Sequence, residues 1–335
     1  MSRSLPPGNG ESRIKKQTEM KYMTLKDKVL GALLDARGEE LSGQALAGRF
    51  GVSRSAVWKA VKTLRAEGAD SASGTNRGYR LSPDCDLLSA EHIRALLGDT
   101  LPVYVYQSID STSSECKRRL SQGEERCLVL ATEQTGGRGR RGKSFFSPGD
   151  AGLYMSLAMP MDMSLSSAVG VTAYAAVCVC GAIREVTGRK CGIKWVNDLY
   201  LDGKKVCGIL SEAVTGLEAG DAHSVVIGVG VNLHPCTVPP ELEDIVGFLG
   251  CGPVKNELCA AIVSRLQRFD PADKSYMDEY RAQSVVLGRE VRYCLDGVEK
   301  RGCAEQIGDD GALHVRTSSG VDVLRGGEVS LTGIK

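Results

Sequence analysis

The sequence predicts a multi-domain α+β chain with a small helical unit at its start, a larger central unit built on a mixed β-sheet, and a small β-barrel at its end. Its 335 residues correspond to about two or three domains. The hydrophobic period changes from helical to mixed after residue 82, and to short β-type runs after residue 284. Hydrophobic residues make up 42% and charged residues 25%, which is ordinary for a chain that buries a core and excludes general disorder.

Net charge distinguishes the first part of the chain from the rest. The whole chain carries +1, but residues 21–82 hold 11 Lys and Arg against 6 Asp and Glu, and residues 1–20 add +2. Residues 83–335 therefore sum to −6. A basic segment joined to an acidic body is the asymmetry expected when one module binds nucleic acid. Residues 1–22 are polar and aperiodic, which predicts a flexible tail.

Residues 23–82 are predicted to form a winged helix-turn-helix. Ser42 and Ser53 can cap two short helices, with Gly51 as the turn between them. The second helix has an apolar face, and SASGTNRGYRL (71–81) is typical of a β-wing. The candidate DNA contacts lie on the other face of that helix and in the wing: Ser53, Arg54, Ser55, Lys59, Lys62 and Arg77.

An ordinary pair of amphipathic helices also has a solvated basic face, so periodicity alone leaves that interpretation open. The glycine turn, the predicted wing and the local excess of basic residues favour DNA binding. Ser55, Lys59 and Lys62 are the candidates for contacts with base edges, while Lys and Arg side chains supply the salt-dependent contacts with phosphates.

Residues 83–284 predict an α/β unit with a mixed or largely antiparallel sheet. IKWVNDLYL (193–201), the turn Asp202-Gly203 and the run after it predict a hairpin. The uncharged run Met163–Ile183 is rich in small residues and lacks interfacial anchors, which favours a buried helix over a membrane span. The other strand-like runs are Val103–Tyr106, Cys127–Thr132, Leu153–Met159 and SVVIGVGVNL (224–233).

Residues 285–335 predict an SH3-like β-barrel. Short runs of β-forming residues alternate there with four turn pairs, Asp296-Gly297, Asp310-Gly311, Ser319-Gly320 and Gly326-Gly327.

The cysteines and the N-terminus predict a cytoplasmic protein. MSRSLPPGNGESRIKK has no apolar segment of the kind a secretory signal needs. The 12 cysteines are therefore expected to be reduced and mostly buried, and no Cys/His group has zinc-finger spacing.

The segment EQTGGRGRRGKSFFSPG (133–149) predicts an anion-binding loop. Glycines allow backbone N–H groups to approach an anion, and guanidinium groups bind phosphate through two hydrogen bonds. The segment lacks the pattern of a Walker A loop or of a dinucleotide-binding turn. RGG-type disorder is the alternative, but a single copy that follows a strand and precedes Ser-Pro-Gly fits it poorly.

Two further motifs are candidates for the same site. In KWVND, alternation turns Lys194 inward from an apolar strand, where a lysine needs an anionic partner. Asn197 and Asp198 follow it and can position a ribose, an amide or a magnesium ion. In GVGVN, Gly228 and Gly230 are expected to let a ligand lie against the strand, although they can equally serve helix packing.

In this order and spacing, GRGRRGKSFFSP, KWVNDLYL, KVCGIL and VIGVGVN resemble the biotin–protein ligase family. Together with the predicted helix-turn-helix, the chain from about residue 24 resembles the bifunctional members of that family, which are both biotin–[acetyl-CoA-carboxylase] ligases and repressors of the biotin operon.

The resemblance implies a class II synthetase-like ligase domain and a two-step reaction. Biotin and MgATP give biotinyl-5′-AMP and pyrophosphate, and the biotinyl group then passes to a lysine of a biotin carboxyl carrier domain. Lys194 and Arg140 are the implied catalytic residues, and metal ligands stay unassigned. The implied biotin site is Ser111, Thr112, Ser113, Gln134, Arg138, Gly139, Arg140, Lys194 and Gly208, and the implied ATP site is Arg140, Arg141, Lys143, Phe145, Asn197, Asp198 and Asn232.

The resemblance also implies regulation by the product of the first step. In regulatory members the adenylate promotes a homodimer, and the two winged helices then match a two-fold operator. No membrane partner is expected.

The chain departs from the family pattern at four places. Ser113 replaces Asn, Val196 replaces Pro, Lys143 stands where Arg is common, and the terminal SLTGIK lacks an Arg. Three rival interpretations remain: a lipoate or octanoyl ligase on the same scaffold, a ligand-sensing repressor with a catalytically weak domain, and a ligase that no longer binds DNA.

Overall fold

The computed structural model describes residues 24–36, 38–69, 71–72, 78–98, 100–163, 168–215 and 222–331. The predicted tail 1–22 and Arg77 lie outside the described residues. The chain divides into two compact units, residues 1–95 and 96–335. Because the start of α5 (Ala90–Leu97) packs against α2 (Leu25–Asp35), where His92 Nδ1 lies 2.7 Å from Asp35 Oδ1, the first unit extends past the predicted boundary at residue 82.

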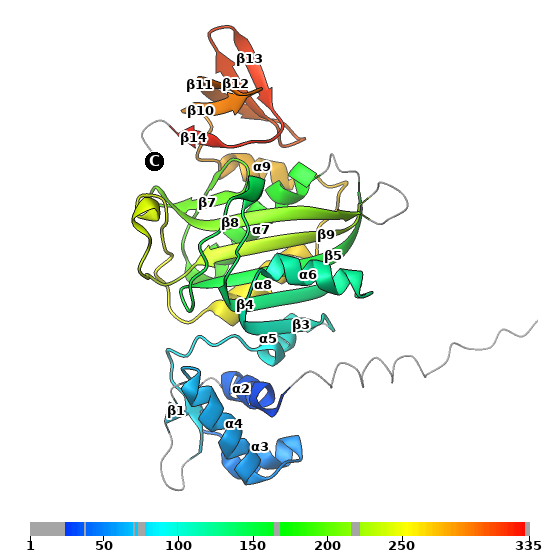
Figure 1. Ribbon diagram of the computed structural model, residues 1–335, viewed down its shortest axis with the longest axis vertical. Coiled ribbons are helices and arrows are strands. Elements are labelled where there is room, and N and C mark those ends of the chain that lie inside the picture. The colour runs from blue at the N-terminus through cyan, green and yellow to red at the C-terminus, as the bar shows by residue number, and fades with distance from the viewer. Residues whose placement is uncertain are drawn as a thin grey trace, which may run out of the picture. The chain divides into compact units, whose positions relative to one another are not determined.

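The first unit contains the predicted helix-turn-helix (Figure 1). Both predicted N-caps are confirmed, because Ser42 Oγ accepts from Ala45 N–H at 3.0 Å and Ser53 Oγ accepts from Ala56 N–H at 3.2 Å. The predicted turn is confirmed as well, because Gly51 is left-handed with φ 65°. After α2 come α3 (Gly43–Phe50), α4 (Arg54–Ala66) and two short antiparallel strands, β1 (Ser71–Ala72) and β2 (Arg80–Leu81).

The core of the first unit joins all three helices. Val57, Val61 and Leu64 of α4 are buried, as their spacing predicts, and they pack in one cluster with Leu33 of α2 and Leu46 of α3. Burying side chains of this size stabilises the fold by about 1.5–3 kcal/mol each. The opposite face of α4 is thereby fixed toward solvent.

The second unit is built on a seven-stranded mixed sheet of order β3-β4-β5-β9-β8-β7-β6 (Figure 1). Strands β3 and β4 are parallel, and all the other pairs are antiparallel. The bounds are β3 (Val103–Ile109), β4 (Cys127–Gln134), β5 (Gly152–Met163), β6 (Gly192–Lys194), β7 (Asp198–Leu201), β8 (Lys204–Thr215) and β9 (Ala222–Asn232).

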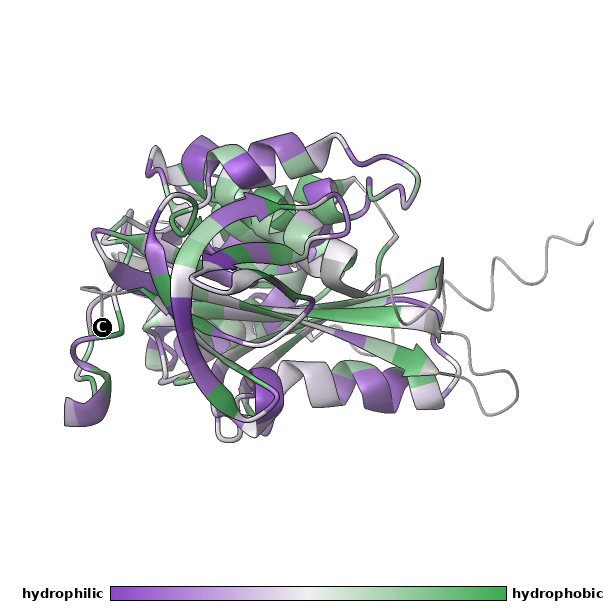
Figure 2. Cartoon of the chain, turned by 90° about the horizontal axis from the view of Figure 1, so that it is seen from above, coloured by the Kyte–Doolittle hydropathy of each residue, from purple (hydrophilic) through white to green (hydrophobic). Residues whose placement is uncertain are grey.

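Helices lie on both faces of this sheet, and Figure 2 shows hydrophobic strands between them. Helix α6 (Thr112–Ser121) packs on β4, β5 and β9, while α7 (Ala168–Thr187), with α8 (Lys255–Leu266) and α9 (Tyr276–Ala282), packs on the other face. Among the described residues, α7 is the one helix long and apolar enough to cross a membrane by length and composition, and it is mostly buried inside the protein.

The predicted hairpin around Asp202-Gly203 is confirmed, because β7 and β8 are antiparallel, but IKWVNDLYL is not one continuous strand. The segment forms two antiparallel strands, β6 and β7, around a turn that contains the cis peptide Trp195–Val196. Tertiary contacts hold this turn, since the Trp195 indole N–H donates to Gly311 O at 2.9 Å and the Asn197 amide donates to Ile209 O at 2.8 Å. Strand alternation carries no information about such contacts. As a result, Lys194 faces Asp198 across the two strands.

The C-terminal region forms a five-stranded antiparallel sheet of order β13-β12-β11-β10-β14, consistent with the predicted barrel. Gly297, Gly311, Gly320 and Gly327, one from each predicted turn pair, have positive φ. The fold class predicted from sequence is therefore confirmed. The strands are β10 (Glu290–Leu295), β11 (Val298–Ile307), β12 (Leu313–Thr317), β13 (Gly320–Leu324) and β14 (Val329–Leu331).

Candidate functional site

A cavity of about 380 Å³ in the second unit collects most of the residues that the sequence singled out. It lies between the start of α6, the arginine loop after β4, strands β6 to β9, and the loop before β14. Its lining includes Ser111, Thr112, Ser113, Gln134, Arg138, Gly139, Arg140, Lys143, Phe145, Lys194, Asn197, Asp198 and Gly208.

Lys194 supplies a positive charge inside this cavity. Its ammonium group donates to the Tyr200 hydroxyl at 3.2 Å and lies 5.0 Å from the centre of the Tyr200 ring. Burial lowers the pKa of Lys194, although the charge of Asp198 opposes that effect. Within the part of the chain that the structure describes, no carboxylate forms an ion pair with Lys194, which leaves its ammonium group able to bind an anionic ligand.

Arg140 connects the arginine loop to the turn between β6 and β7 and to the loop before β14. Its Nη1 donates to Asn197 Oδ1 at 3.3 Å and to the backbone oxygen of Gly327 at 3.2 Å. Burial lowers its pKa as well. Lys143 pairs with Glu328 at 2.5 Å. Burial on its own would raise the pKa of Glu328, but the hydrogen bond from Lys143 and the positive charges of Lys143, Arg140 and Lys205 together lower it. The C-terminal sheet therefore contributes directly to this site.

Lys205 is a cavity residue that the sequence reasoning missed. Its ammonium group lies 2.8 Å from Asp198 Oδ1 and 5.8 Å from the centre of the Phe145 ring. Tyr200, Trp195 and Glu328 also line the cavity without having been predicted. A lysine in KKVCGIL next to a predicted turn carries no sequence signal that distinguishes it from a solvated one; only the pairing of β7 with β8 places it beside Asp198.

Hydroxyl and amide groups surround the end of the cavity that lies at the start of α6. Gln134 Oε1 accepts from the backbone N–H of Thr112 at 2.9 Å and from its hydroxyl at 3.1 Å. The Ser156 hydroxyl is hydrogen-bonded to Thr112 at 2.7 Å and to Ser113 at 2.9 Å. Because Gln134 Nε2 also donates to Ser147 at 3.0 Å, these side chains are held in fixed orientations. One end of the cavity is thus polar and uncharged, and the other is cationic.

Three glycines of strands β8 and β9 line the cavity and lie close to Phe145 and Ser113. A Cβ atom on Gly230 would lie 2.3 Å from the Phe145 ring, and one on Gly208 would lie 2.9 Å from it. A Cβ atom on Gly228 would lie 2.7 Å from the Ser113 hydroxyl. These glycines therefore leave room for Phe145 and Ser113 above the strands, and because they also line the cavity, the approach of a ligand to these strands stays a prediction.

Two predicted nucleotide contacts lie outside this lining. Arg141 is exposed, has φ 56° and is not among the residues that line the cavity. Asn232 is buried, and its amide donates to Lys205 O at 3.3 Å. Here Asn232 fixes the backbone of the strand that carries Lys205.

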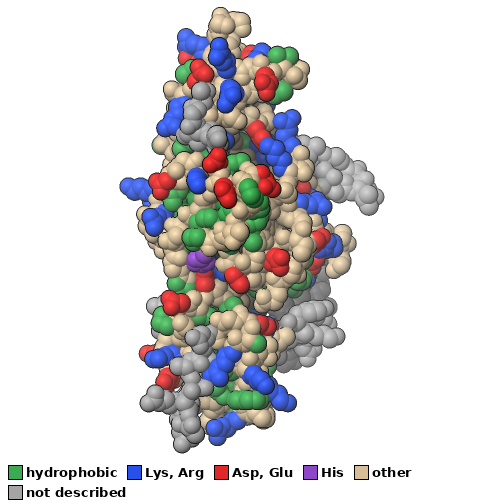
Figure 3. Space-filling model, turned by 60° about the vertical axis from the view of Figure 1, so that its left-hand side comes forward, with side chains coloured by type: hydrophobic (Ala, Val, Ile, Leu, Met, Phe, Trp, Pro, Cys, Tyr) green, Lys and Arg blue, Asp and Glu red, His purple; other side chains and the backbone are tan. Residues whose placement is uncertain are grey.

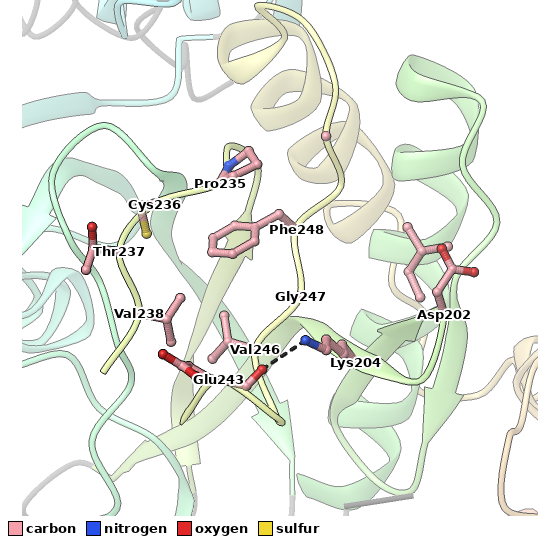
Figure 4. Close-up of a pocket in the computed structure, with 12 residues that line it drawn as sticks. Asp202, Lys204, Pro235, Cys236, Thr237, Val238, Glu243, Val246, Gly247 and Phe248 are labelled. Carbon is pink, nitrogen blue, oxygen red and sulfur yellow. Dashed lines mark hydrogen bonds between the residues drawn. The ribbon is translucent and has the colours of Figure 1, made fainter. Parts of the chain in front are cut away.

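A second cavity of about 640 Å³ lies beside the β7–β8 turn (Figure 4). Pro235, Val238 and Phe248 give it apolar walls, and the Lys204 ammonium is engaged with the backbone oxygen of Glu243 at 2.9 Å. None of the predicted site residues lines it. The smaller cavity, with its converging cations and fixed hydroxyls, is the better candidate for catalysis.

The exposed face of α4 is the second candidate surface. Arg54, Ser55, Lys59 and Lys62 are all exposed, and no acidic residue occurs within the helix. Figure 3 shows Lys and Arg side chains beside an exposed hydrophobic patch on one face of this unit. Ser53, the N-cap, also bonds to the Ser55 hydroxyl at 2.9 Å.

Known protein families match both regions of the chain, the one that forms the cavity and the one that contains α4. Residues 105–232 match the biotin/lipoate A/B protein ligase family, and residues 26–80 match an HTH domain. The bifunctional ligase/repressor BirA of Escherichia coli is 32% identical over 324 residues, which cover 93% of this chain and 98% of that protein. BirA of Bacillus subtilis is 30% identical over 92% of this chain and 99% of its own length. The chain belongs to the BirA family of bifunctional ligase/repressors.

A solved structure shares the fold of the second unit of this BirA-family chain. The biotin protein ligase from Aquifex aeolicus in complex with biotin and ATP has a TM-score of 0.58 and 24% identity, and the match covers 69% of this chain and 98% of that one. In the BirA-family chain the ligase match spans β3 to β9, the strands that build the cavity, and the HTH match spans α2 to α4.

Proposed function

We propose that this protein activates biotin with ATP to biotinyl-5′-AMP, transfers the biotinyl group to a lysine of a biotin carboxyl carrier domain, and represses biotin genes as an adenylate-bound homodimer. One observation carries the catalytic part: a single cavity, in a chain of the BirA family, combines fixed hydroxyl and amide groups at one end with Lys194, Arg140 and Lys205 at the other. We also propose a cytoplasmic location, in keeping with its bacterial relatives.

The first step joins two anions. A carboxylate oxygen of biotin attacks the α-phosphorus of ATP, the bond to the β-phosphate oxygen breaks, and pyrophosphate leaves with that electron pair. Negative charge accumulates on the α-phosphate oxygens, so cations fixed beforehand stabilise the transition state more than the separated reactants. Lys194 and Arg140 have this role in our proposal, and Lys205 adds a third charge at the same end.

The polar end of the cavity suits the ring system of biotin. Its ureido group has both hydrogen-bond donors and an acceptor, and Thr112, Ser113 and Gln134 offer both kinds of partner. Because hydrogen bonds with Ser156 and Ser147 already hold these side chains, they lose little conformational freedom when a ligand binds. Arg138 and Gly139 of the loop close the site from the solvent side in this proposal.

The second step needs no side-chain nucleophile from this protein. The neutral amine of the acceptor lysine attacks the acyl carbon of the adenylate, AMP leaves, and the nitrogen loses a proton. A mixed anhydride hydrolyses in water, so the loop and Phe145, which already packs over Gly208 and Gly230, are proposed to exclude water.

A magnesium ion that accompanies ATP fits the residues present. Mg²⁺ usually takes one or two protein carboxylates besides phosphate and water oxygens. The carboxylates that line the cavity are Asp198 and Glu328, each paired with a lysine. The described residues hold no cluster of three or more Asp, Glu, His or Cys for a resident metal. When bound, the ion would neutralise phosphate charge.

The decisive experiment incubates purified full-length protein with ATP, a biotin carboxyl carrier domain, and either biotin or lipoate. Labelling of one carrier lysine with biotin, and not with lipoate, is expected. Pyrophosphate release in the reaction with lipoate, but not in the reaction with biotin, would favour a lipoate ligase. Binding of biotin and ATP without pyrophosphate release would favour a ligand-sensing repressor.

The regulatory part has its own test. Promoter DNA upstream of biotin genes is expected to shift with the protein only when biotin and ATP are both present, and less at high salt. Absence of any shift, with normal carrier labelling, would leave a ligase without repressor activity.

A further inference from the structure

The exposed face of α4 carries a large aromatic side chain that the DNA-contact residues named above do not include. Trp58 is 52% exposed, whereas Trp195, the other tryptophan of the chain, is 3% exposed. Tryptophan is highly buried on average, because its indole ring is the largest apolar surface that a side chain offers to the core. An indole directed to solvent in the middle of a helix therefore needs an explanation other than packing within its own unit.

The surroundings of Trp58 are basic. Successive helical residues advance by about 100°, so Trp58 lies between Arg54 and Lys62 on one stripe of α4, with Ser55 on the adjoining stripe. The Lys62 ammonium lies 5.4 Å from the centre of the indole ring. The buried side of the helix is formed by other residues, Val57, Ala60, Val61 and Leu64.

We propose that Trp58 contacts bases directly and recognises thymine through its 5-methyl group. This inference rests on the proposed DNA-binding function and adds a specificity-determining residue to it. A helix in the major groove meets the thymine methyl as the one apolar group on the base edges, and apolar side chains are the contacts that distinguish it.

The charge around Trp58 favours DNA over a second protein as the partner that contacts this face of α4. A protein-binding tryptophan gains most in a patch depleted of charge. Here the indole is flanked by cations, and no acidic residue lies within α4 to neutralise them. No ion pair engages Arg54, Lys59 or Lys62 within the described part of the chain. Double-stranded DNA matches both features of this face. Its phosphates can pair with the cations, and the thymine methyl groups in its major groove can contact the indole.

Trp58 is also placed to orient Lys62. An ammonium group over an indole face is attracted by about 0.5–1 kcal/mol at an exposed site. A role confined to this would make Trp58 a support for the DNA contact of Lys62, independent of the thymine methyl group. The two roles differ in their dependence on the thymine methyl, and the experiment uses that difference.

The test begins with selection of binding sites by the full-length protein, with biotin and ATP, from a library of random duplexes. The selected duplex is then rebuilt with deoxyuridine in place of each thymidine in turn, which removes only the methyl group. Wild-type protein, Trp58→Ala, Trp58→Phe and Lys62→Ala are titrated against each duplex. Val298→Ala is the matched control, because Val298 is similarly exposed, at 57%, but lies in the C-terminal sheet.

At one or two positions, deoxyuridine is expected to weaken wild-type binding about tenfold, as is typical of one lost base contact. Trp58→Ala is expected to weaken binding to the thymidine duplex by about the same factor, and to lose nothing more when those positions carry deoxyuridine. Trp58→Phe should keep part of the discrimination, while Lys62→Ala and Val298→Ala should keep all of it. Because carrier labelling reports on the second unit, circular dichroism and thermal unfolding of every variant check that the helices of the first unit remain folded.

If Trp58→Ala weakens DNA binding by the same factor whether each position carries thymidine or deoxyuridine, the proposal is overturned. Trp58 would then serve to support Lys62. Unchanged DNA affinity together with weaker self-association of Trp58→Ala in sedimentation would overturn it in favour of a protein contact. If the wild-type protein selects no sequence at all, the DNA-binding function itself fails, and this inference fails with it.

Discussion

The two units of this chain both present cations to an anion, but they hold them in opposite environments. In the cavity of the second unit, Lys194 and Arg140 are partly buried, and burial lowers the pKa of both. On α4 of the first unit, Arg54, Lys59 and Lys62 are exposed to solvent. The cavity groups are oriented by hydrogen bonds to Tyr200 and Asn197.

The difference shows how the environment of a charge determines what it recognises. A partly desolvated cation interacts strongly with one anion at a fixed place, as stabilisation of a reacting phosphate requires. Solvated cations interact weakly one by one, but they release counterions together when they meet a polyanion, so their binding is strong only at low salt.

Replacing Lys194 by Ala is expected to lower the rate of adenylation about 10²- to 10³-fold, the scale seen when one preorganised charge-stabilising group is removed. Biotin-dependent pyrophosphate release measures it. Lys190→Ala is the control, because Lys190 is exposed and lies only four residues away in the same segment. Intact adenylation by Lys194→Ala would contradict the proposed mechanism.

Replacing Lys205 by Ala is expected to lower adenylation by roughly 10- to 100-fold, since it removes a cavity cation and leaves Asp198 without its lysine. The same pyrophosphate assay, run across a range of ATP concentrations, measures it. The adjacent Lys204→Ala provides the comparison, because that lysine is exposed and bonds to Glu243 O beside the other cavity. If both variants lose activity equally, the cavity assignment of Lys205 is wrong.

Adenylation is expected to fall on the alkaline side at a lower pH than an exposed lysine would give. The protonated form of Lys194 is the active one, and burial lowers its pKa, so the charge is lost as pH rises through that lowered value. A pH–rate profile measures the fall. Lys194→Arg retains its charge to higher pH, so its alkaline fall should move upward even if its maximum rate is lower. An unmoved fall would assign the titration to another group.

Replacing Arg54 by Ala is expected to reduce the slope of log K against log salt for DNA binding by about one, and to weaken binding several-fold at moderate salt. Fluorescence anisotropy at several salt concentrations measures the slope. Carrier labelling should be unaffected, because Arg54 belongs to the first unit. An unchanged slope would show that Arg54 contacts no phosphate.

Much of this architecture was predictable, because local patterns reported it. The caps Ser42 and Ser53, the left-handed Gly51 and the glycine turns of the C-terminal sheet are each set by a few neighbouring residues. The turn inside KWVND was not predictable in this way. It is held by Trp195 and Asn197, whose partners Gly311 and Ile209 come from other parts of the chain.

The composition of the site divides along the same line. Residue type and spacing are local properties, and they were enough to predict the arginine-glycine loop, the inward lysine and the basic helix. Folding places Lys205 and Glu328 in the lining of the cavity and leaves Asn232 and Arg141 outside it. It also packs Phe145 and Ser113 close to the glycines of β8 and β9. The physical reason is that strand pairing and the docking of the C-terminal sheet bring together side chains that are far apart in the sequence.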